Sequence, residues 1–315
     1  SSWLKFGLFT VGLGQSFVFV LVPPLARDLG LSEIQTSSIF AISALAWATT
    51  SAFWGRTSDK YGRRNIAILG LVGYSISLIA LITPLFLAQK NLLNVTLLFP
   101  ALVLGRLING LVGSATRPAS FAYIADITSK DNRTVKFARL ESSFLLGTVA
   151  GPLVGGFLFL ISNETPFYVF SGLAFIAAIG IYRKLDSVTK KKNTVKKLNK
   201  INWYSSTIWP FLAFAAVLSL CQASLLQSIG FYITDLYSDF DNLPTLISMT
   251  FALLSISTIV SQYIFTDAFP MNNFNLLLFG TLLLIFSYFT MAFYQTISVY
   301  YLSLIHISEP TRRRT

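Results

Sequence analysis

Long apolar runs alternate with short polar segments along almost the whole chain. A helix needs roughly 20 apolar residues to cross a hydrocarbon core of about 30 Å, and runs of this length recur. We therefore predict an all-α integral membrane protein, because backbone groups in lipid must form their hydrogen bonds within the segment, whereas a β-barrel would show short alternating strands. The predicted spans are residues 4–25, 37–54, 65–87, 95–125, 138–161, 165–182, 207–234, 243–265 and 274–294, and a tenth begins near Thr296.

The charge distribution orients these spans. Hydrophobic residues make up 54% of the chain and the mean hydropathy is +0.64, so the net charge of +11 does not indicate a soluble protein that binds nucleic acid. Basic residues gather in alternate connections, and the positive-inside rule makes these connections and the N-terminus cytoplasmic. They are Arg56, Lys60, Arg63, Arg64, Lys130, Arg133, Lys136, Arg139, Arg183, Lys184, Lys190, Lys191, Lys192, Lys196, Lys197 and Lys200. The opposite connections hold Arg27 and Lys90.

The chain divides into two membrane units and a basic segment between them. We predict a complete N-terminal six-helix transmembrane bundle in residues 1–182, a basic cytoplasmic linker in residues 183–204, and a partial C-terminal transmembrane bundle in residues 205–301. Two such units are typical of duplicated transporters, whose substrate site lies between the halves.

The last residues, 302–315, do not continue the pattern of a membrane helix. The string "LSLIHISEPTR" resembles an in-frame translation of a transposase adapter used for DNA sequencing libraries. We expect these residues to be a non-native tail, which would include His306, the one histidine of the chain. The one cysteine, Cys221, lies inside the seventh predicted span, so neither a disulfide nor a cysteine-based metal site is expected.

The stretch "GRTSDKYGRR", which connects the second and third spans, carries five charges in ten residues. We expect Gly55 to let backbones approach closely at a helix end, Asp59 to accept hydrogen bonds at a helix N-terminus, and Gly62 to permit a tight turn. Arg63 and Arg64 are expected to anchor at the lipid surface.

The pattern G-x-x-x-D-K-x-G-R-R resembles the major facilitator superfamily of secondary transporters. In that family this turn is a gate element that holds the two halves together on the cytoplasmic side when the cavity faces out. The resemblance implies a cytoplasmic gate motif of six residues: Gly55, Asp59, Lys60, Gly62, Arg63 and Arg64.

The fourth span carries two arginines, "LVLGRLINGLVGSATRPASFAYIADIT". At about 100° per residue, Arg106, Gly110, Gly113 and Arg117 share one stripe, which we predict to line the central cavity, since arginines within a span must face protein or water. The alternative that Arg117 snorkels to the cytoplasmic surface stays open. The string "RLING" resembles the fourth-helix motif of antiporters, with Asn109 where glutamine is usual, and there the arginine is linked to proton coupling.

The fifth span reads "GTVAGPLVGG". Its glycines recur at every fourth residue and form a ridge for close helix contact, and its proline bends the helix. The string resembles the signature of proton-driven exporters, where it packs on the eighth helix, which here offers Ser257 and Ser261. This antiporter glycine motif comprises Gly147, Gly151, Pro152, Gly155 and Gly156.

From Gly105 to Gly156 the chain looks most like the twelve-helix drug:proton antiporters, which include tetracycline and multidrug exporters. Val11 and Ser77 stand where tetracycline exporters carry acids, so tetracycline itself is not the expected substrate. Glu141 is the acid that lies inside an N-terminal span. It is expected to be a solvated carboxylate, a partner of another helix, or a proton carrier. Because Glu141 lies near the cytoplasmic end of the fifth span, we do not expect it to neutralise an arginine of the fourth span.

These features favour a secondary active transporter, specifically a proton-coupled exporter of small organic molecules that works by alternating access. An uptake carrier for metabolites or organic anions of the same superfamily is the alternative. An intramembrane enzyme is disfavoured because the histidine content supplies neither an H-E-x-x-H motif nor a serine-protease base, and the gate turn disfavours a receptor. We expect no cofactor, no metal and no catalytic residue. The expected protein is a monomer in the cell membrane, with protons and a small molecule as partners.

The cavity prediction includes a substrate preference. Polar residues expected to face the cavity or to act in coupling are Gln15, Arg106, Asn109, Gly110, Arg117, Glu141, Gln222 and Gln227. Because no acid of the first or third span balances the two arginines, the sequence favours anionic or zwitterionic substrates over cationic drugs.

Overall fold

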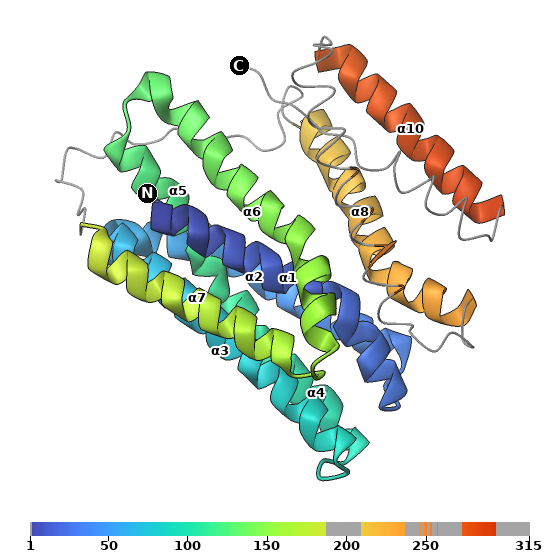
Figure 1. Cartoon of the computed structure of the whole chain (residues 1–315). Coiled ribbons are helices and arrows are strands. Elements are labelled where there is room, and N and C mark those ends of the chain that lie inside the picture. The colour runs from blue at the N-terminus through green and yellow to red at the C-terminus, as the bar shows by residue number, and fades with distance from the viewer. Residues whose placement is uncertain are drawn as a thin grey trace.

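The computed structural model describes residues 2–186, 209–236 and 273–293, together with five isolated positions between 246 and 257 (Figure 1). These residues form helices and no strands. The helices are α1 (Ser2–Asp28), α2 (Glu33–Tyr61), α3 (Arg63–Gln89), α4 (Val95–Leu111), the 3₁₀ turn η1 (Gly113–Ala115), α5 (Thr116–Ile127), α6 (Lys130–Phe159), α7 (Thr165–Lys184), α8 (Trp209–Leu236) and α10 (Asn273–Phe293).

The prediction of an all-α membrane protein is confirmed for these residues. Five segments are long and apolar enough to cross a membrane: Ser2–Asp28, Arg63–Gln89, Val95–Ile127, Val135–Phe159 and Thr165–Lys184. The third of them, Val95–Ile127, joins α4, η1 and α5, and so contains the whole fourth predicted span. The predicted spans 207–234 and 274–294 coincide with α8 and α10 within two residues, whereas the predicted span 37–54 lies within the longer helix α2.

Several predictions fall on residues outside those that the structure describes. These are most of the linker 183–204, most of the eighth span, Ser261 and the tail 302–315. Gln222 and Gln227 lie on α8, but their side chains also belong to the part that is not described.

Helix α1 forms the centre of the N-terminal bundle. It packs along α6 more extensively than any other described pair of helices pack, and it also contacts α7 (Figure 1). Its Phe17 ring is fully buried and meets Phe167 and Phe170 of α7 edge to face, at centroid distances of 5.1 and 5.4 Å. These aromatic contacts and the close helix packing stabilise the bundle where lipid supplies no hydrophobic driving force between helices.

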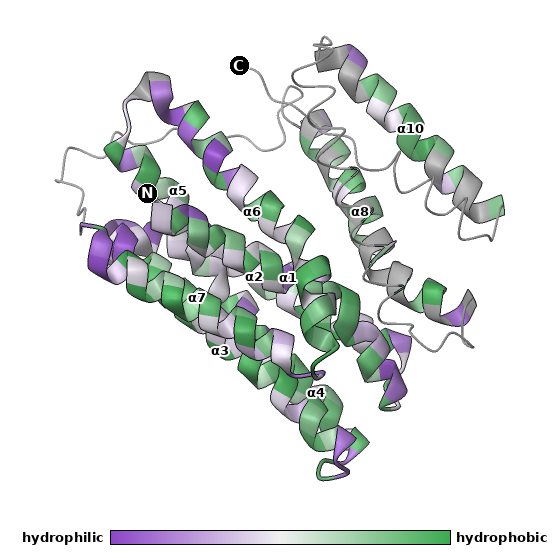
Figure 2. Cartoon of the chain, in the orientation of Figure 1, coloured by the Kyte–Doolittle hydropathy of each residue, from purple (hydrophilic) through white to green (hydrophobic). Residues whose placement is uncertain are grey.

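Hydrophilic residues gather at the two ends of the helices, whereas the middle is apolar (Figure 2). One end carries the α2–α3 turn, the α5–α6 connection and the end of α7, and we call it the basic end. The N-terminus lies there too (Figure 1). The other end, which we call the opposite end, carries the α1–α2 connection, where Ser32 and Gln35 form a capping box.

Candidate functional site: an arginine cluster, a buried arginine and an interhelix ion pair

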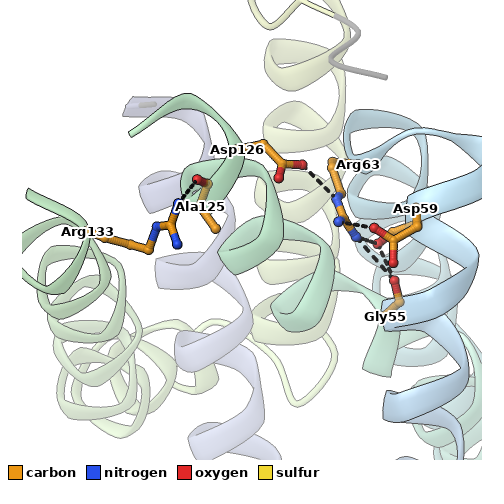
Figure 3. Close-up of polar contacts among 7 residues, drawn as sticks. Gly55, Asp59, Arg63, Ala125, Asp126 and Arg133 are labelled. Carbon is orange, nitrogen blue, oxygen red and sulfur yellow. Dashed lines mark hydrogen bonds and ion pairs between the residues drawn. The ribbon is translucent and has the colours of Figure 1, made fainter. Parts of the chain in front are cut away.

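The α2–α3 turn is built around a single buried guanidinium (Figure 3). The side chain of Arg63, at the start of α3, is only 8% exposed. Its Nε donates to Asp126 Oδ2 of α5 at 3.1 Å, and it forms an ion pair with Asp59 one helical turn earlier (Figure 3). Its Nη1 donates to Ser58 Oγ at 2.5 Å and to the Gly55 carbonyl at 3.2 Å. One arginine thus ties together α2, α3 and α5.

The structure changes the roles predicted for several residues of the gate motif. Gly62 has φ 94°, so the tight turn at this glycine is confirmed. Gly55 does not serve close backbone approach, because a Cβ there would meet nothing within 4 Å; its carbonyl instead accepts from Arg63. The prediction that Asp59 caps a helix is replaced by its ion pair with Arg63.

The prediction that both arginines of the turn anchor at lipid is wrong for Arg63, which is buried between helices. Arg64 donates to the Leu185 carbonyl at 2.9 Å and lies over the ring of Tyr182, and so contacts the end of α7. Lys60 is exposed and lies over the Tyr61 ring.

Asp126 belongs to this site, and the sequence analysis did not single it out. Its carboxylate is 13% exposed and is 63 residues away from its partner in sequence. The signal was present in the string "AYIADIT", where an acid follows an apolar helix, but nothing local indicates which cation it meets. Beside it, Arg133 of α6 donates to the Ala125 carbonyl at 2.9 Å, which fixes the α5–α6 connection to the same cluster (Figure 3).

The predicted stripe of the fourth span does not stay on one face. The η1 turn winds about three residues per turn instead of 3.6, so it rotates α5 relative to α4. A Cβ on Gly110 would meet the Ser43 carbonyl of α2 at 2.5 Å. Arg106 and Arg117 therefore meet different neighbours, described below.

Arg106 is the most buried arginine that the structure describes, at 2% exposure. Its guanidinium carbon lies 5.5 Å from the ring centroid of Phe19 and 5.4 Å from that of Phe40, and these two rings stack on each other. Its Nε and Nη1 are buried and have no hydrogen-bond partner among the described residues. Cation–π contacts contribute up to about 2 kcal/mol when desolvated, which is less than the several kcal/mol that burial of a charge costs.

The backbone around Arg106 is held by side chains of α2 and α3, of which the sequence analysis singled out Ser77 alone, as a position matched to tetracycline exporters. Ser43 Oγ donates to the Arg106 carbonyl at 2.9 Å, and Ser77 Oγ donates to the Gly105 carbonyl at 2.9 Å. Two more donors of α2 reach carbonyls further along α4: Thr50 Oγ1 donates to the Gly110 carbonyl at 2.9 Å, and Trp54 Nε1 donates to the Leu111 carbonyl at 2.6 Å. These donors reach carbonyls that already belong to a helix, so α4 is fixed between α2 and α3.

The other candidate cavity residues lie on the same bundle. Asn109 is buried, and its Oδ1 has no hydrogen-bond partner and points toward Gly113. Gln15 is half-buried on α1. Val11, one of the positions matched to tetracycline exporters, is buried, and its carbonyl accepts from Tyr74 Oη at 3.1 Å.

Arg117 pairs with Glu141, contrary to the argument that the acid is too close to its helix end to neutralise an arginine. Nη2 donates to Oε1 and Oε2, both at 2.6 Å, and the guanidinium lies 4.6 Å from the Phe144 ring centroid. The start of α5 therefore meets the basic half of α6. No basic residue stands three or four positions from Glu141, so the sequence disfavoured an ion pair within the helix, and the contact comes from another helix, which was one of the alternatives left open.

The glycine ridge of α6 packs on α1, and the predicted packing on the eighth helix stays a prediction, because most of that helix lies outside the described residues. A Cβ on Gly147 would meet the Phe9 carbonyl at 2.1 Å, and one on Gly151 would meet the Leu13 carbonyl at 2.2 Å. Gly155 faces the Phe17 ring. The ridge thus allows α1 and α6 to approach more closely than side chains would permit.

Comparison with known proteins identifies the family. The family model of the Major Facilitator Superfamily matches residues 4–308. The chain is 30% identical over 207 residues to the quinolone resistance protein NorA of Staphylococcus aureus, covering 64% of this chain and 50% of that protein. It is 34% identical over 160 residues to the class B tetracycline resistance protein of Escherichia coli, covering 50% of this chain and 37% of that protein. The matched part of this chain thus covers half or less of the length of each of these relatives.

Solved structures support the fold alone. A bacterial homologue of the human lysosomal transporter Spinster, in an inward-facing and occupied conformation, superposes with a TM-score of 0.70 at 14% identity, covering 98% of this chain and 70% of that one. A D-xylose-proton symporter gives a TM-score of 0.66 at 16% identity, covering 98% and 78%. The family comprises transporters rather than enzymes or receptors. The resemblance drawn from the sequence motifs is confirmed, and the chain belongs to the Major Facilitator Superfamily.

Proposed function

We propose that the full-length protein containing this chain is a secondary transporter of the cell membrane that exports small organic molecules in exchange for protons. It acts as a monomer by alternating access between two helix bundles, with residues 1–182 as the first bundle and residues 205–301 as part of the second. Family membership and the two antibiotic resistance proteins among the relatives support this class of activity.

The observation that carries proton coupling is the pair between Arg117 and Glu141. A carboxylate on a membrane-spanning helix holds α6 to α5 only while it is ionised. Its protonation removes the electrostatic part of the contact and leaves a neutral acid. Because the two side chains are 33% and 38% exposed, protons reach them without passing through the packed core. We therefore assign proton acceptance to Glu141.

Arg63 with its partners Asp59 and Asp126, which we call the Arg63 cluster, supports a gate at the basic end. The positive-inside rule makes this end cytoplasmic. Asp59 and Asp126 hold α2, α3 and α5 as one unit. A gate needs such a rigid unit, because alternating access moves one bundle against the other and the helices of each bundle must move together. The antiporter glycine motif adds to this rigidity through the close contact of α6 with α1.

The test uses the purified full-length protein in proteoliposomes with an imposed pH gradient. Ethidium, whose fluorescence reports its accumulation, is the cationic probe and 1-naphthoate the anionic one. We expect accumulation of at least one of them against its gradient, and its collapse when a protonophore is added. Glu141→Gln should abolish uphill accumulation yet retain substrate exchange at equal pH. Glu164→Gln, at the start of α7, is the matched control and should behave as the wild type.

Two results would contradict the proposal. Accumulation that follows a sodium gradient and ignores the pH gradient would remove proton coupling, and no movement of any probe would remove the transport function itself. Accumulation of the probe on the side with the higher proton concentration corresponds to exchange for protons, because the probe then moves opposite to the proton flow. Accumulation in the direction of proton flow would instead support the alternative, an uptake carrier for organic anions or metabolites.

A further inference from the structure

The described arginines of the N-terminal bundle differ in how their charge is compensated. Arg63 and Arg117 each form an ion pair with a carboxylate. Arg106 forms none among the described residues, although it is the most deeply buried. Two of its nitrogens, Nε and Nη1, are enclosed by protein and have no acceptor in the part of the chain that the structure describes. A buried cation with vacant donors is what an anion-binding group requires.

The surroundings of Arg106 suit an organic anion better than a small inorganic one. The guanidinium lies beside the stacked pair of Phe19 from α1 and Phe40 from α2. Aromatic faces attract the apolar body of a ligand, while guanidinium N–H groups bind a planar carboxylate. Phe40 is buried, but Phe19 keeps partial exposure. The Phe19 ring is therefore the side on which a ligand approaches.

The backbone of Arg106 is fixed while its side chain lacks a partner. Ser43 holds its carbonyl, and a Cβ on Gly105 would already collide with the Ala80 carbonyl at 2.7 Å. The arginine is thus presented from a segment of α4 that is fixed by its neighbours. Rigid presentation of this kind favours specific binding, because little conformational entropy is lost on binding.

We propose that Arg106, Phe19 and Phe40 form a binding subsite for the carboxylate-bearing end of an aromatic organic anion or zwitterion. The carboxylate accepts hydrogen bonds from the vacant guanidinium donors, and the ring of the ligand packs against Phe19. The subsite names a substrate class for the transporter and in that sense rests on the proposed function. Its binding step can nevertheless be measured in the absence of any gradient.

The primary experiment compares two ligands of the same shape and different charge. Binding of 1-naphthoate and of the neutral 1-naphthamide to the purified full-length protein is measured at constant pH by equilibrium dialysis. We expect the anion to bind about tenfold more tightly or better, the ratio that one charge-assisted hydrogen bond supplies. Equal affinities would overturn the proposal without the need for any variant.

Variants then locate the effect. Arg106→Gln should bring the ratio of the two affinities close to one and leave ethidium binding unchanged, and Arg106→Lys should retain part of the preference because the charge remains. Arg139→Gln, which removes an exposed arginine of α6, should leave the ratio unchanged. If Arg106→Gln weakened all three ligands equally, Arg106 would be a structural residue and the subsite would be wrong.

The two proposals fail in different ways. Proton-driven accumulation of ethidium without any preference for 1-naphthoate in the binding assay would keep the transport function and overturn the subsite. Preferential binding of 1-naphthoate that depends on Arg106, without accumulation of either probe under a pH gradient, would support the subsite and overturn proton-coupled transport.

Discussion

Arg63 and Arg106 are both buried in the N-terminal bundle, and their surroundings are opposite. Arg63 has two carboxylates, a hydroxyl and a carbonyl around its guanidinium. Arg106 lies beside two aromatic rings, and two of its nitrogens have no acceptor within the described ranges. The comparison teaches that burial alone does not reveal what an arginine does. The guanidinium with its acceptors in place joins helices, whereas we propose that the one without them binds a ligand.

If this contrast is correct, removal of an acceptor from Arg63 should have the largest effect on stability. Asp126→Asn leaves a cation that is 8% exposed with one carboxylate instead of two. We expect a loss of about 2–3 kcal/mol, below the full cost of breaking a buried pair because Asp59 remains. Thermal unfolding of the purified protein in detergent measures this loss. Asp28→Asn, at an exposed position of α1, is the control, and equal melting temperatures for the two variants would contradict the structural role of the cluster.

The turn that places Arg63 gives the next largest effect. Gly62 has φ 94° and ψ 133°, a conformation that side chains rarely adopt, so Gly62→Ala should cost about 1–3 kcal/mol. Gly55→Ala is the matched substitution in the same motif. Its Cβ enters open space within a helix, and the change should stabilise the protein by about 0.5–1 kcal/mol. The same unfolding measurement distinguishes them, and a Gly55→Ala variant as unstable as Gly62→Ala would show that the glycine is needed for close packing after all.

The different success of the sequence predictions has a physical cause. The helices were predicted well because the length and apolarity of a span are local properties. The contacts of Arg63 with Asp126 and of Arg117 with Glu141 were not predicted, because they join residues 63 and 24 positions apart. A single sequence shows which residues are unusual in a span but not which of them meet.

The glycine ridge of α6 illustrates the same limit. Its spacing predicts a close helix contact, and the structure has that contact. The identity of the described partner, α1, is set by how the helices assemble in space and not by the spacing of the glycines. Likewise, the stripe of the fourth span assumed a regular helix, and the η1 turn at Gly113–Ala115 breaks that regularity.

Glu141→Gln should change stability much less than Asp126→Asn does. Both members of the Arg117–Glu141 pair are about one-third exposed, so water screens the charges, and such pairs contribute about 0–1 kcal/mol. The variant should therefore unfold at nearly the wild-type temperature even where its proton-driven transport is lost. A loss of stability as large as that of Asp126→Asn would indicate that the acid is a structural residue, and its assignment to proton coupling would be wrong.

The smallest effect is expected where an ion pair joins α1 to α8 at the opposite end. Arg27 Nη1 donates to Asp235 Oδ1 at 2.7 Å, lies 3.7 Å from Glu33 and faces the Phe231 ring. The side chains of Arg27 and Asp235 are 35% and 59% exposed, so solvent weakens their attraction. Asp235→Asn should cost less than about 1 kcal/mol in unfolding, because Glu33 remains beside the arginine.

A double-mutant cycle with Arg27→Gln isolates the contribution of this pair, since it removes what each substitution does alone. We expect a coupling energy of a few tenths of a kcal/mol at low salt, falling further at an ionic strength of about 1 M, where the screening length is about 3 Å. A coupling that exceeds 2 kcal/mol and persists in high salt would place this pair with the Arg63 cluster. The order of effects would then no longer follow burial, and the contrast between satisfied and unsatisfied arginines would need another explanation.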